Sequence, residues 1–168
     1  MLKVSIKKNN EVPFSELRFY SSLNPIPFTL CMNGNVLLPE TIYARNISGE
    51  NFIEFRFDSG TKRLYEITLV AIQNNTVKLL EDRYISTKVS INNEFFNCYI
   101  DEDSDSEISL PMQILRSETS ISIFWSINDL NYYSVSENCL IGVDRNNFLC
   151  SISIMKLSKE ELFEIFGF

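Results

Sequence analysis

Apolar and polar residues alternate with a period of two along much of this chain, and that alternation limits the folds open to it. It is clearest in residues 52–57 (FIEFRF) and recurs in residues 2–6, 121–127 and 150–154. Successive side chains of a β-strand point to opposite faces, so the pattern predicts half-buried strands of antiparallel sheets. The apolar residues are expected to face a core, and the charged residues and serines between them are expected to face solvent.

Turn-forming residues separate the alternating runs. Short polar segments rich in Asn, Asp or Gly occur at residues 58–60, 73–75, 92–94 and 144–147. Because these residue types tolerate the positive φ angles of tight turns, each segment predicts a hairpin between the strands that flank it. A chain of such hairpins predicts a mainly β fold, built as an antiparallel sandwich or a barrel-like meander.

One short helix is predicted near the C-terminus, at about residues 158–166. Ser158 and Glu161 have the spacing of a capping box, and an apolar stripe follows them. An earlier segment, residues 14–23, fits either a helix or a strand. The 168 residues show no linker and no clear internal repeat, so we expect a single β-rich domain spanning residues 1–168.

The composition excludes most catalytic chemistry. The chain has no histidine, which rules out Ser-His-Asp and Cys-His catalysis and every histidine-based metal site. Its five glycines are too widely spaced for a phosphate-binding loop. The enzymatic alternative is a carboxylate pair of the glycosidase kind, drawn from Glu54, Glu66 and Glu94. These residues also fit the solvent face of strands, so we expect no catalytic residue and no cofactor.

The four cysteines are interpreted as reduced residues of the core. Cys31, Cys98, Cys139 and Cys150 lie among apolar residues and form no C-x-x-C pair, so no zinc site is expected. The N-terminus lacks the apolar segment of a signal peptide, and no run approaches the ~20 apolar residues that span a bilayer. We therefore expect a cytoplasmic protein with no membrane partner.

Negative charge dominates the chain and gathers in one segment. The net charge of −7 argues against nucleic acid as a partner, because phosphates are bound by Lys and Arg, and suits a basic partner or no charged partner. Residues 101–107 read DEDSDSE. They contribute five carboxylates, those of Asp101, Glu102, Asp103, Asp105 and Glu107.

Three interpretations of this acidic run are open from the sequence. It begins like the D-x-D-x-D of a calcium-binding loop, but Ser106 stands where that loop has Gly and Met112 where it has Glu. It also fits a solvated loop between two strands. The third interpretation is a docking site for a basic protein, which would relieve a repulsion of ~1 kcal/mol between carboxylates about 4 Å apart in water.

Tyr132 and Tyr133 are a second candidate contact region. Tyrosine is typical of protein interfaces, and it is also an ordinary core or rim residue of β proteins. The hypothetical partner-binding set therefore consists of these two tyrosines and the five carboxylates of the acidic run.

An acidic, histidine-free, mostly β chain with no catalytic constellation resembles the bacterial immunity proteins, including those of contact-dependent growth-inhibition systems. Such proteins neutralise a cognate toxin, often a basic nuclease. The resemblance implies a non-catalytic inhibitor whose partner is a basic toxin domain, with DEDSDSE as the contact. The group has no shared signature, so no residue's role follows from it. The alternatives are a structural or ligand-binding β module of a phage or secretion system and, after that, a carboxylate-based hydrolase.

Overall fold

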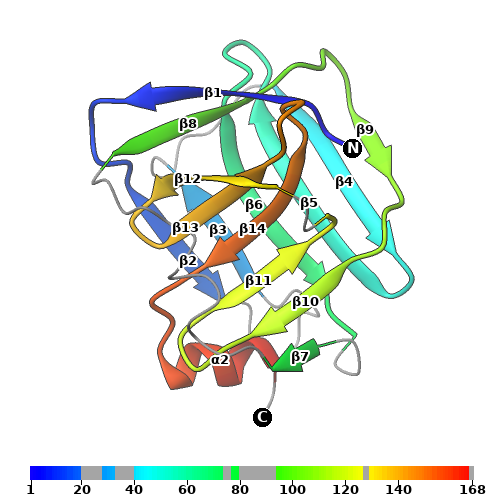
Figure 1. Cartoon of the computed structure of the whole chain (residues 1–168), viewed down its shortest axis with the longest axis vertical. Coiled ribbons are helices and arrows are strands. Elements are labelled where there is room, and N and C mark those ends of the chain that lie inside the picture. Colours follow the sequence, from blue (N-terminus) through cyan, green and yellow to red (C-terminus); the bar gives the residue numbers. More distant parts are fainter. Residues whose placement is uncertain (20–27, 33–39, 74–76, 80–93, 127–128, 167–168) are drawn as a thin grey trace.

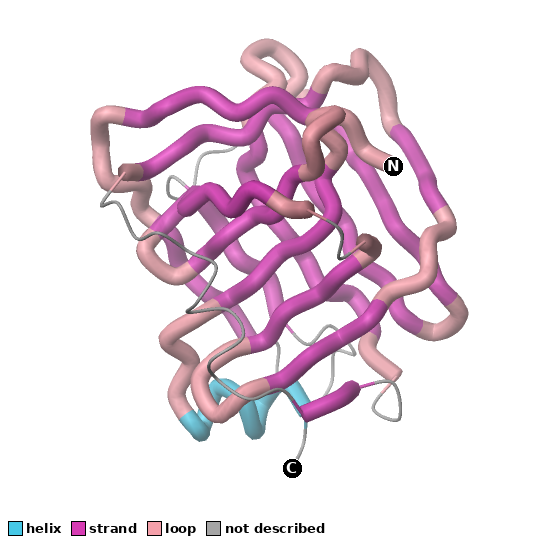
Figure 2. The backbone as a smooth tube through the Cα atoms, in the orientation of Figure 1, coloured by secondary structure: helices cyan, strands magenta, loops and turns pink. Residues whose placement is uncertain are grey.

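The computed structural model describes residues 1–19, 28–32, 40–73, 77–79, 94–126 and 129–166. These residues form a mainly β structure with two six-stranded sheets, one two-stranded ribbon and a short C-terminal helix (Figures 1 and 2). The predicted fold class, mainly β with a helix near the C-terminus, is confirmed.

The first sheet has the strand order β2-β3-β6-β5-β4-β9. Neighbouring strands are antiparallel, except that β9 pairs with β4 in parallel. The bounds of these strands are β2 Ser15–Phe19, β3 Phe28–Met32, β4 Thr41–Ser48, β5 Asn51–Asp58, β6 Leu64–Ala71 and β9 Ser106–Ile108.

The second sheet has the strand order β12-β13-β14-β11-β10-β7. Its strands are also antiparallel, except for the parallel pair β10 and β7. The bounds are β7 Val77–Leu79, β10 Gln113–Arg116, β11 Ile121–Phe124, β12 Asn131–Ser136, β13 Cys139–Val143 and β14 Leu149–Ile154.

A ribbon and a helix lie at opposite ends of the two sheets (Figure 1). The ribbon pairs β1 (Val4–Asn9) with β8 (Phe95–Ile100). It touches both sheets, because Lys3 bridges to Phe148 beside β14 and Tyr99 bridges to Arg63 beside β6. The helix α2 spans Lys159–Phe166 and buries three apolar side chains.

The capping box predicted for this helix is present. The Ser158 amide donates to Glu161 Oε2 at 2.7 Å, and the Glu161 amide donates to Ser158 Oγ at 3.1 Å. The two bonds satisfy amide donors that the first helical turn leaves unpaired.

The inner faces of the two sheets share one hydrophobic core. Phe55 of β5 stacks on Trp125, which follows β11, with ring centroids 5.9 Å apart. Each fully buried Leu, Ile or Phe side chain contributes about 1.5–3 kcal/mol relative to an exposed one. The largest such side chains on the inner faces are Phe28, Phe55, Phe57, Leu30, Ile53, Ile67, Leu69, Ile114, Ile121, Ile123 and Ile141.

The alternating serines of β11 and β14 are buried, contrary to the expectation that they face solvent. Ser122 and Ser151 are 0% exposed, and Ser153 is 1% exposed. Ser122 Oγ donates to Ser153 Oγ at 2.7 Å, which satisfies a pair of hydroxyls away from water. The alternation separates the two faces correctly, but it does not show that both faces of these strands are covered.

The prediction of a hairpin across residues 73–75 is wrong. The strand that follows, β7, does not return along β6 but pairs in parallel with β10 of the other sheet. Turn-forming residues permit a reversal of the chain, but they do not select the strand with which the next segment pairs. The hairpins across residues 58–60 and 144–147 are confirmed. Each has a register shift close to its turn, between Arg56 and Phe57 in the first and between Gly142 and Val143 in the second.

Two further predictions fall partly outside the described residues. Of the segment 14–23, which fitted helix or strand, residues 15–19 form a strand. Of the turn predicted at residues 92–94, only Glu94 is described, and it precedes β8.

The cysteines are free and buried, as expected. Burial raises the pKa of Cys98, and it raises the pKa of Cys139 to about 12. Both thiols are therefore protonated in the folded chain at pH values where an unfolded thiol ionises.

This difference predicts a loss of stability at alkaline pH. Because the thiol pKa is higher in the folded chain than in the unfolded chain, the thiols contribute to the free energy of unfolding. This contribution is fully present below the unfolded thiol pKa of 9.0 and decreases as the pH rises toward the folded pKa. The free energy of unfolding, measured in urea, should therefore fall between pH 9 and 10.5. The Cys98→Ala/Cys139→Ala variant should show a shallower fall from its own lower starting value, and equal slopes would contradict this account.

The close packing of Gly142 against Ser151 leads to a prediction for a pair of substitutions. A Cβ at this position would overlap Ser151 Oγ, a buried hydroxyl that has no hydrogen-bond partner among the described residues. Gly142→Ala should therefore destabilise the chain by about 1–3 kcal/mol, because extra volume strains a packed site. In the Ser151→Ala background the cost should be smaller, because the overlapping atom is gone. Equal costs in the two backgrounds, measured by urea unfolding, would show that this contact does not limit the site.

Candidate functional site

The acidic run lies at an edge of the first sheet. It begins where β8 ends, at Ile100, and continues into β9, the outermost strand beside β4 (Figure 1). We call its five carboxylate residues, Asp101, Glu102, Asp103, Asp105 and Glu107, the acidic edge. All of them are exposed except Glu102, which is half-buried. One interpretation of the run was a solvated loop between two strands, and the structure shows that its last two residues, Ser106 and Glu107, already belong to the second strand.

Backbone contacts fix the acidic edge to the fold at several points. The Asp101 amide donates to the Lys3 carbonyl at 3.1 Å. Asp105 Oδ1 accepts a hydrogen bond of 2.8 Å from the Tyr43 amide, at the point where β9 joins β4. The parallel register then places Glu107 beside Arg45.

A buried asparagine holds the chain just beyond β9. Asn46 is 0% exposed and lies on the inward phase of β4, paired with Ile53 of β5 on one side and Ile108 of β9 on the other. Its Nδ2 donates to the Leu110 carbonyl at 3.2 Å, and its Oδ1 accepts from the Leu110 amide at 2.8 Å. This two-point contact satisfies both backbone groups of Leu110 and ties residues 109–110 to the centre of β4.

Basic residues near the acidic edge offset only part of its charge. Lys62 forms an ion pair of 2.9 Å with Asp103, whose side chain is 93% exposed. Exposed pairs of this kind contribute little, about 0–1 kcal/mol. The hydrogen bond to Glu54, together with the charges of Asp105 and Glu107, raises the pKa of Arg45. Among the described residues, Asp103 is the one member of the acidic edge that forms an ion pair.

The calcium-loop interpretation is not supported by this geometry. Residues 106–108 are extended as a strand rather than wrapped around a centre, because they pair with β4. Within the described part of the chain, no three Cys, Asp or Glu side chains come together as a group that could hold a metal ion.

Tyr132 and Tyr133 do not join the acidic edge. They lie in β12 at the far edge of the second sheet, where Tyr133 packs against the core. Tyr133 meets Phe96 edge-to-face at 5.1 Å between ring centroids, near the start of β8. The acidic edge begins past the other end of β8, about 16 Å away along a strand that rises ~3.3 Å per residue. The hypothetical partner-binding set is therefore two separate regions.

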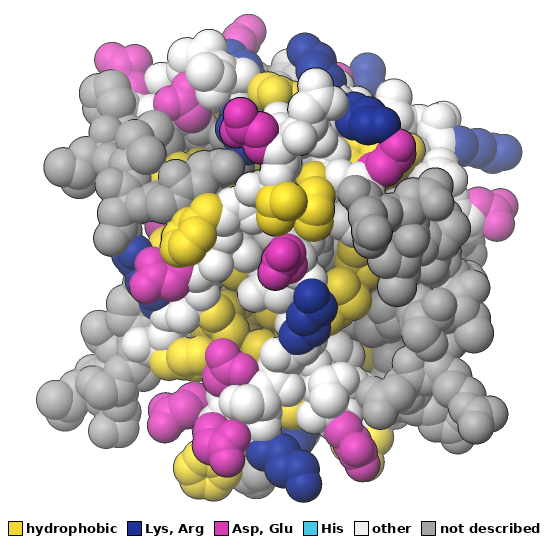
Figure 3. All heavy atoms as spheres, turned by 90° about the vertical axis from the view of Figure 1, so that its left-hand side faces the viewer, with side chains coloured by type: hydrophobic (Ala, Val, Ile, Leu, Met, Phe, Trp, Pro, Cys, Tyr) yellow, Lys and Arg dark blue, Asp and Glu magenta, His cyan; other side chains and the backbone are white. Residues whose placement is uncertain are grey.

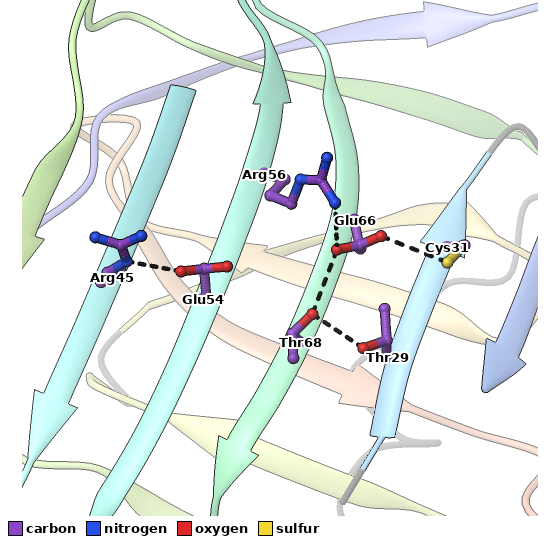
Figure 4. Close-up of polar contacts among 7 residues, drawn as sticks. All are labelled: Thr29, Cys31, Arg45, Glu54, Arg56, Glu66 and Thr68. Carbon is purple, nitrogen blue, oxygen red and sulfur yellow. Dashed lines mark hydrogen bonds and ion pairs between the residues drawn. The ribbon is translucent and has the colours of Figure 1, made fainter. Parts of the chain in front are cut away.

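Two of the three candidate catalytic carboxylates, Glu54 and Glu66, belong to a polar ladder on the outer face of the first sheet (Figure 4). Arg45 Nε donates to Glu54 at 2.6 Å, and Arg56 Nη1 donates to Glu66 at 3.1 Å. Glu66 also accepts from Thr68 Oγ1 at 3.5 Å and Cys31 Sγ at 3.6 Å. Each carboxylate is thus engaged by an arginine, as in a structural ion pair between neighbouring strands.

Glu94 lies apart from this ladder, where it pairs with Lys8 across the β1–β8 ribbon at 2.5 Å. The three carboxylates considered for a glycosidase therefore do not gather at one site.

No protein-family model matches this sequence, and the search among curated proteins finds no match. Among the described residues, none of the helices has the length and apolar character needed to cross a membrane.

Removing the two hydrogen bonds between Asn46 and Leu110 should increase the mobility of the acidic edge more than that of the rest of the sheet. Asn46→Ala leaves the Leu110 amide and carbonyl without their partner, and each unsatisfied buried group costs about 1–3 kcal/mol. Urea unfolding should show this loss, and hydrogen exchange of residues 106–110 should accelerate more than exchange in β5 and β6. Asn131→Ala, at an exposed position in β12, is the matched control and should change neither measurement. Uniform acceleration across the sheet would show that Asn46 supports the whole fold and not this edge.

Proposed function

We propose that this chain is a non-catalytic inhibitor that binds a basic protein through its acidic edge, in the manner of the immunity proteins it resembles. One observation carries the proposal. Five carboxylates lie within seven residues at a fixed edge of a sheet, and one of them forms an ion pair with a described residue. The basic partner is a toxin domain such as a nuclease, and we place the encounter in the cytoplasm, where buried thiols stay reduced.

Electrostatics supports this proposal through the rate of encounter. A patch of one sign raises the association rate of an oppositely charged partner, and the effect weakens with salt because the Debye length is about 8 Å at physiological ionic strength. The chain's net charge of −7 acts in the same direction as the local charge. A basic surface on the partner also removes the repulsion among the carboxylates.

The backbone of β9 gives a second line of support for the proposed binding of a basic protein. Among the described residues β9 pairs with β4 alone, so its outer edge faces no described strand. An edge strand offers amide and carbonyl groups to an added strand, and acidic side chains select a basic one over other sequences. Self-association through this edge is disfavoured, because it would bring like charges together.

The test begins with a protein captured by this chain from its native host, purified and studied as a pair. The triple variant Asp101→Asn/Asp103→Asn/Glu107→Gln removes three of the five negative charges. We expect it to associate several-fold more slowly at low ionic strength, with a rate that depends less on salt. Asp105 stays unchanged, because it accepts the Tyr43 amide and its loss would disturb β9. Stopped-flow or surface-based kinetics measures both quantities.

A matched control removes the same number of charges elsewhere. Glu11, Glu118 and Glu137 are exposed and lie outside the acidic edge, so their replacement by Gln should leave association nearly unchanged. The free energy of unfolding of both triple variants should stay close to that of the parent, because a single exposed substitution usually changes it by no more than about 0.5 kcal/mol. Equal kinetics for the two variants, or the absence of a stoichiometric basic partner, would contradict the proposal and favour a structural or ligand-binding β module.

A further inference from the structure

The two sheets end in four edge strands, and these differ in their capacity to bind a second copy of the chain. The edge of β9 is acidic and repels itself. The strand β7 has three residues. The strand β12 has a register shift between Ser134 and Ser136. The strand β2 is regular over its five residues, and among the described residues it pairs only with β3.

The side chains of β2 are complementary to themselves. Glu16 and Arg18 point to the outer face of the sheet, on either side of Leu17, which packs inward against the core. Arg18 Nη2 lies 2.8 Å from Glu16 Oε2 within the same strand. A second β2 strand in the antiparallel direction, centred on Leu17, would place Glu16 opposite the partner's Arg18 and Arg18 opposite the partner's Glu16. Opposed residues of antiparallel strands have Cβ atoms about 4.5–5.5 Å apart, which is within reach of such a pair.

We propose that β2 pairs with β2 of a second copy of this chain, in antiparallel register about a two-fold axis at Leu17. The pairing gives each edge strand a second neighbour and joins the two first sheets into one continuous sheet. It repeats across the axis the Arg–Glu pairing that already links β4 with β5 and β5 with β6. A two-fold contact of this kind closes on itself and produces a dimer rather than a filament.

Apolar surface beside β2 adds to the contact. Val12 and Phe14, just before the strand, are 62% and 59% exposed. Figure 3 turns this side of the molecule toward the viewer, and hydrophobic side chains are visible over its middle between acidic and basic ones. A five-residue strand pair with these flanking side chains is smaller than the ~1,200–2,000 Å² of stable interfaces, so the dimer is weak and depends on concentration.

The proposal goes beyond the inhibitor function and does not depend on it. The strands β2 and β9 are opposite edges of the first sheet, so dimerisation leaves the acidic edge accessible. A dimer would then present two acidic edges.

Sedimentation equilibrium of the full chain, over a range of concentrations, tests the proposal with three proteins. The parent chain should show a monomer–dimer equilibrium. Glu16→Arg should weaken the dimer about tenfold or more, because two like-charged pairs replace two ion pairs. The double variant Glu16→Arg/Arg18→Glu restores opposite charges at both positions and should recover the parent affinity to within about threefold. Circular dichroism checks that each variant keeps its β structure.

Hydrogen exchange supplies an independent readout. Amides of residues 15–19 should exchange more slowly at high concentration in the parent and in the double variant, but not in the single variant. A parent chain that stays monomeric at every concentration would overturn the proposal. An unchanged dimer in Glu16→Arg, or a double variant that does not recover, would overturn the register and with it the assignment of this edge.

Discussion

The burial of the apolar inner faces of two sheets against each other is the constraint on which the rest of this structure depends. Both sheets contribute to one core, where Phe55 stacks on Trp125 across the interface. The core leaves charged and polar side chains to the outer face of the first sheet, where Arg56 and Glu66 pair between strands. It also makes Asn46 informative, because it is the one buried polar residue of β4 and a buried amide must find partners.

Asn46 connects that core to the acidic edge. Its hydrogen bonds to Leu110 hold the segment that follows β9, while Asp105 accepts the Tyr43 amide at the start of the strand. Like charges favour a spread-out chain, and each close pair costs ~1 kcal/mol even in water. These neutral and backbone contacts offset that cost without neutralising the carboxylates, so the fold keeps its negative charge on the surface. This arrangement is the physical basis of the proposed inhibitor function.

Local sequence patterns predicted the local structure well, but they could not predict which strands pair when the strands lie far apart in the chain. The alternation of residues 52–57 correctly separated the faces of β5, and the capping box of Ser158 located α2. The parallel pairings of β7 and β9 could not be read from turn residues, because each joins segments far apart in the chain. Asn46 was missed, although its place in the apolar phase of residues 41–48 was a usable signal. The distance between Tyr133 and the acidic edge likewise follows from the strand order and not from any motif.

The most direct test of the acidic edge as a binding surface is hydrogen exchange of the full chain with and without the basic protein captured from the host. The inhibitor account predicts that amides of residues 101–108, and of the neighbouring strand β4 at Tyr43 and Arg45, become protected in the complex. Protection should decline in the variant with Asp101→Asn, Asp103→Asn and Glu107→Gln at matched concentration. Protection confined to other surfaces, with exchange at residues 101–108 unchanged, would contradict the account.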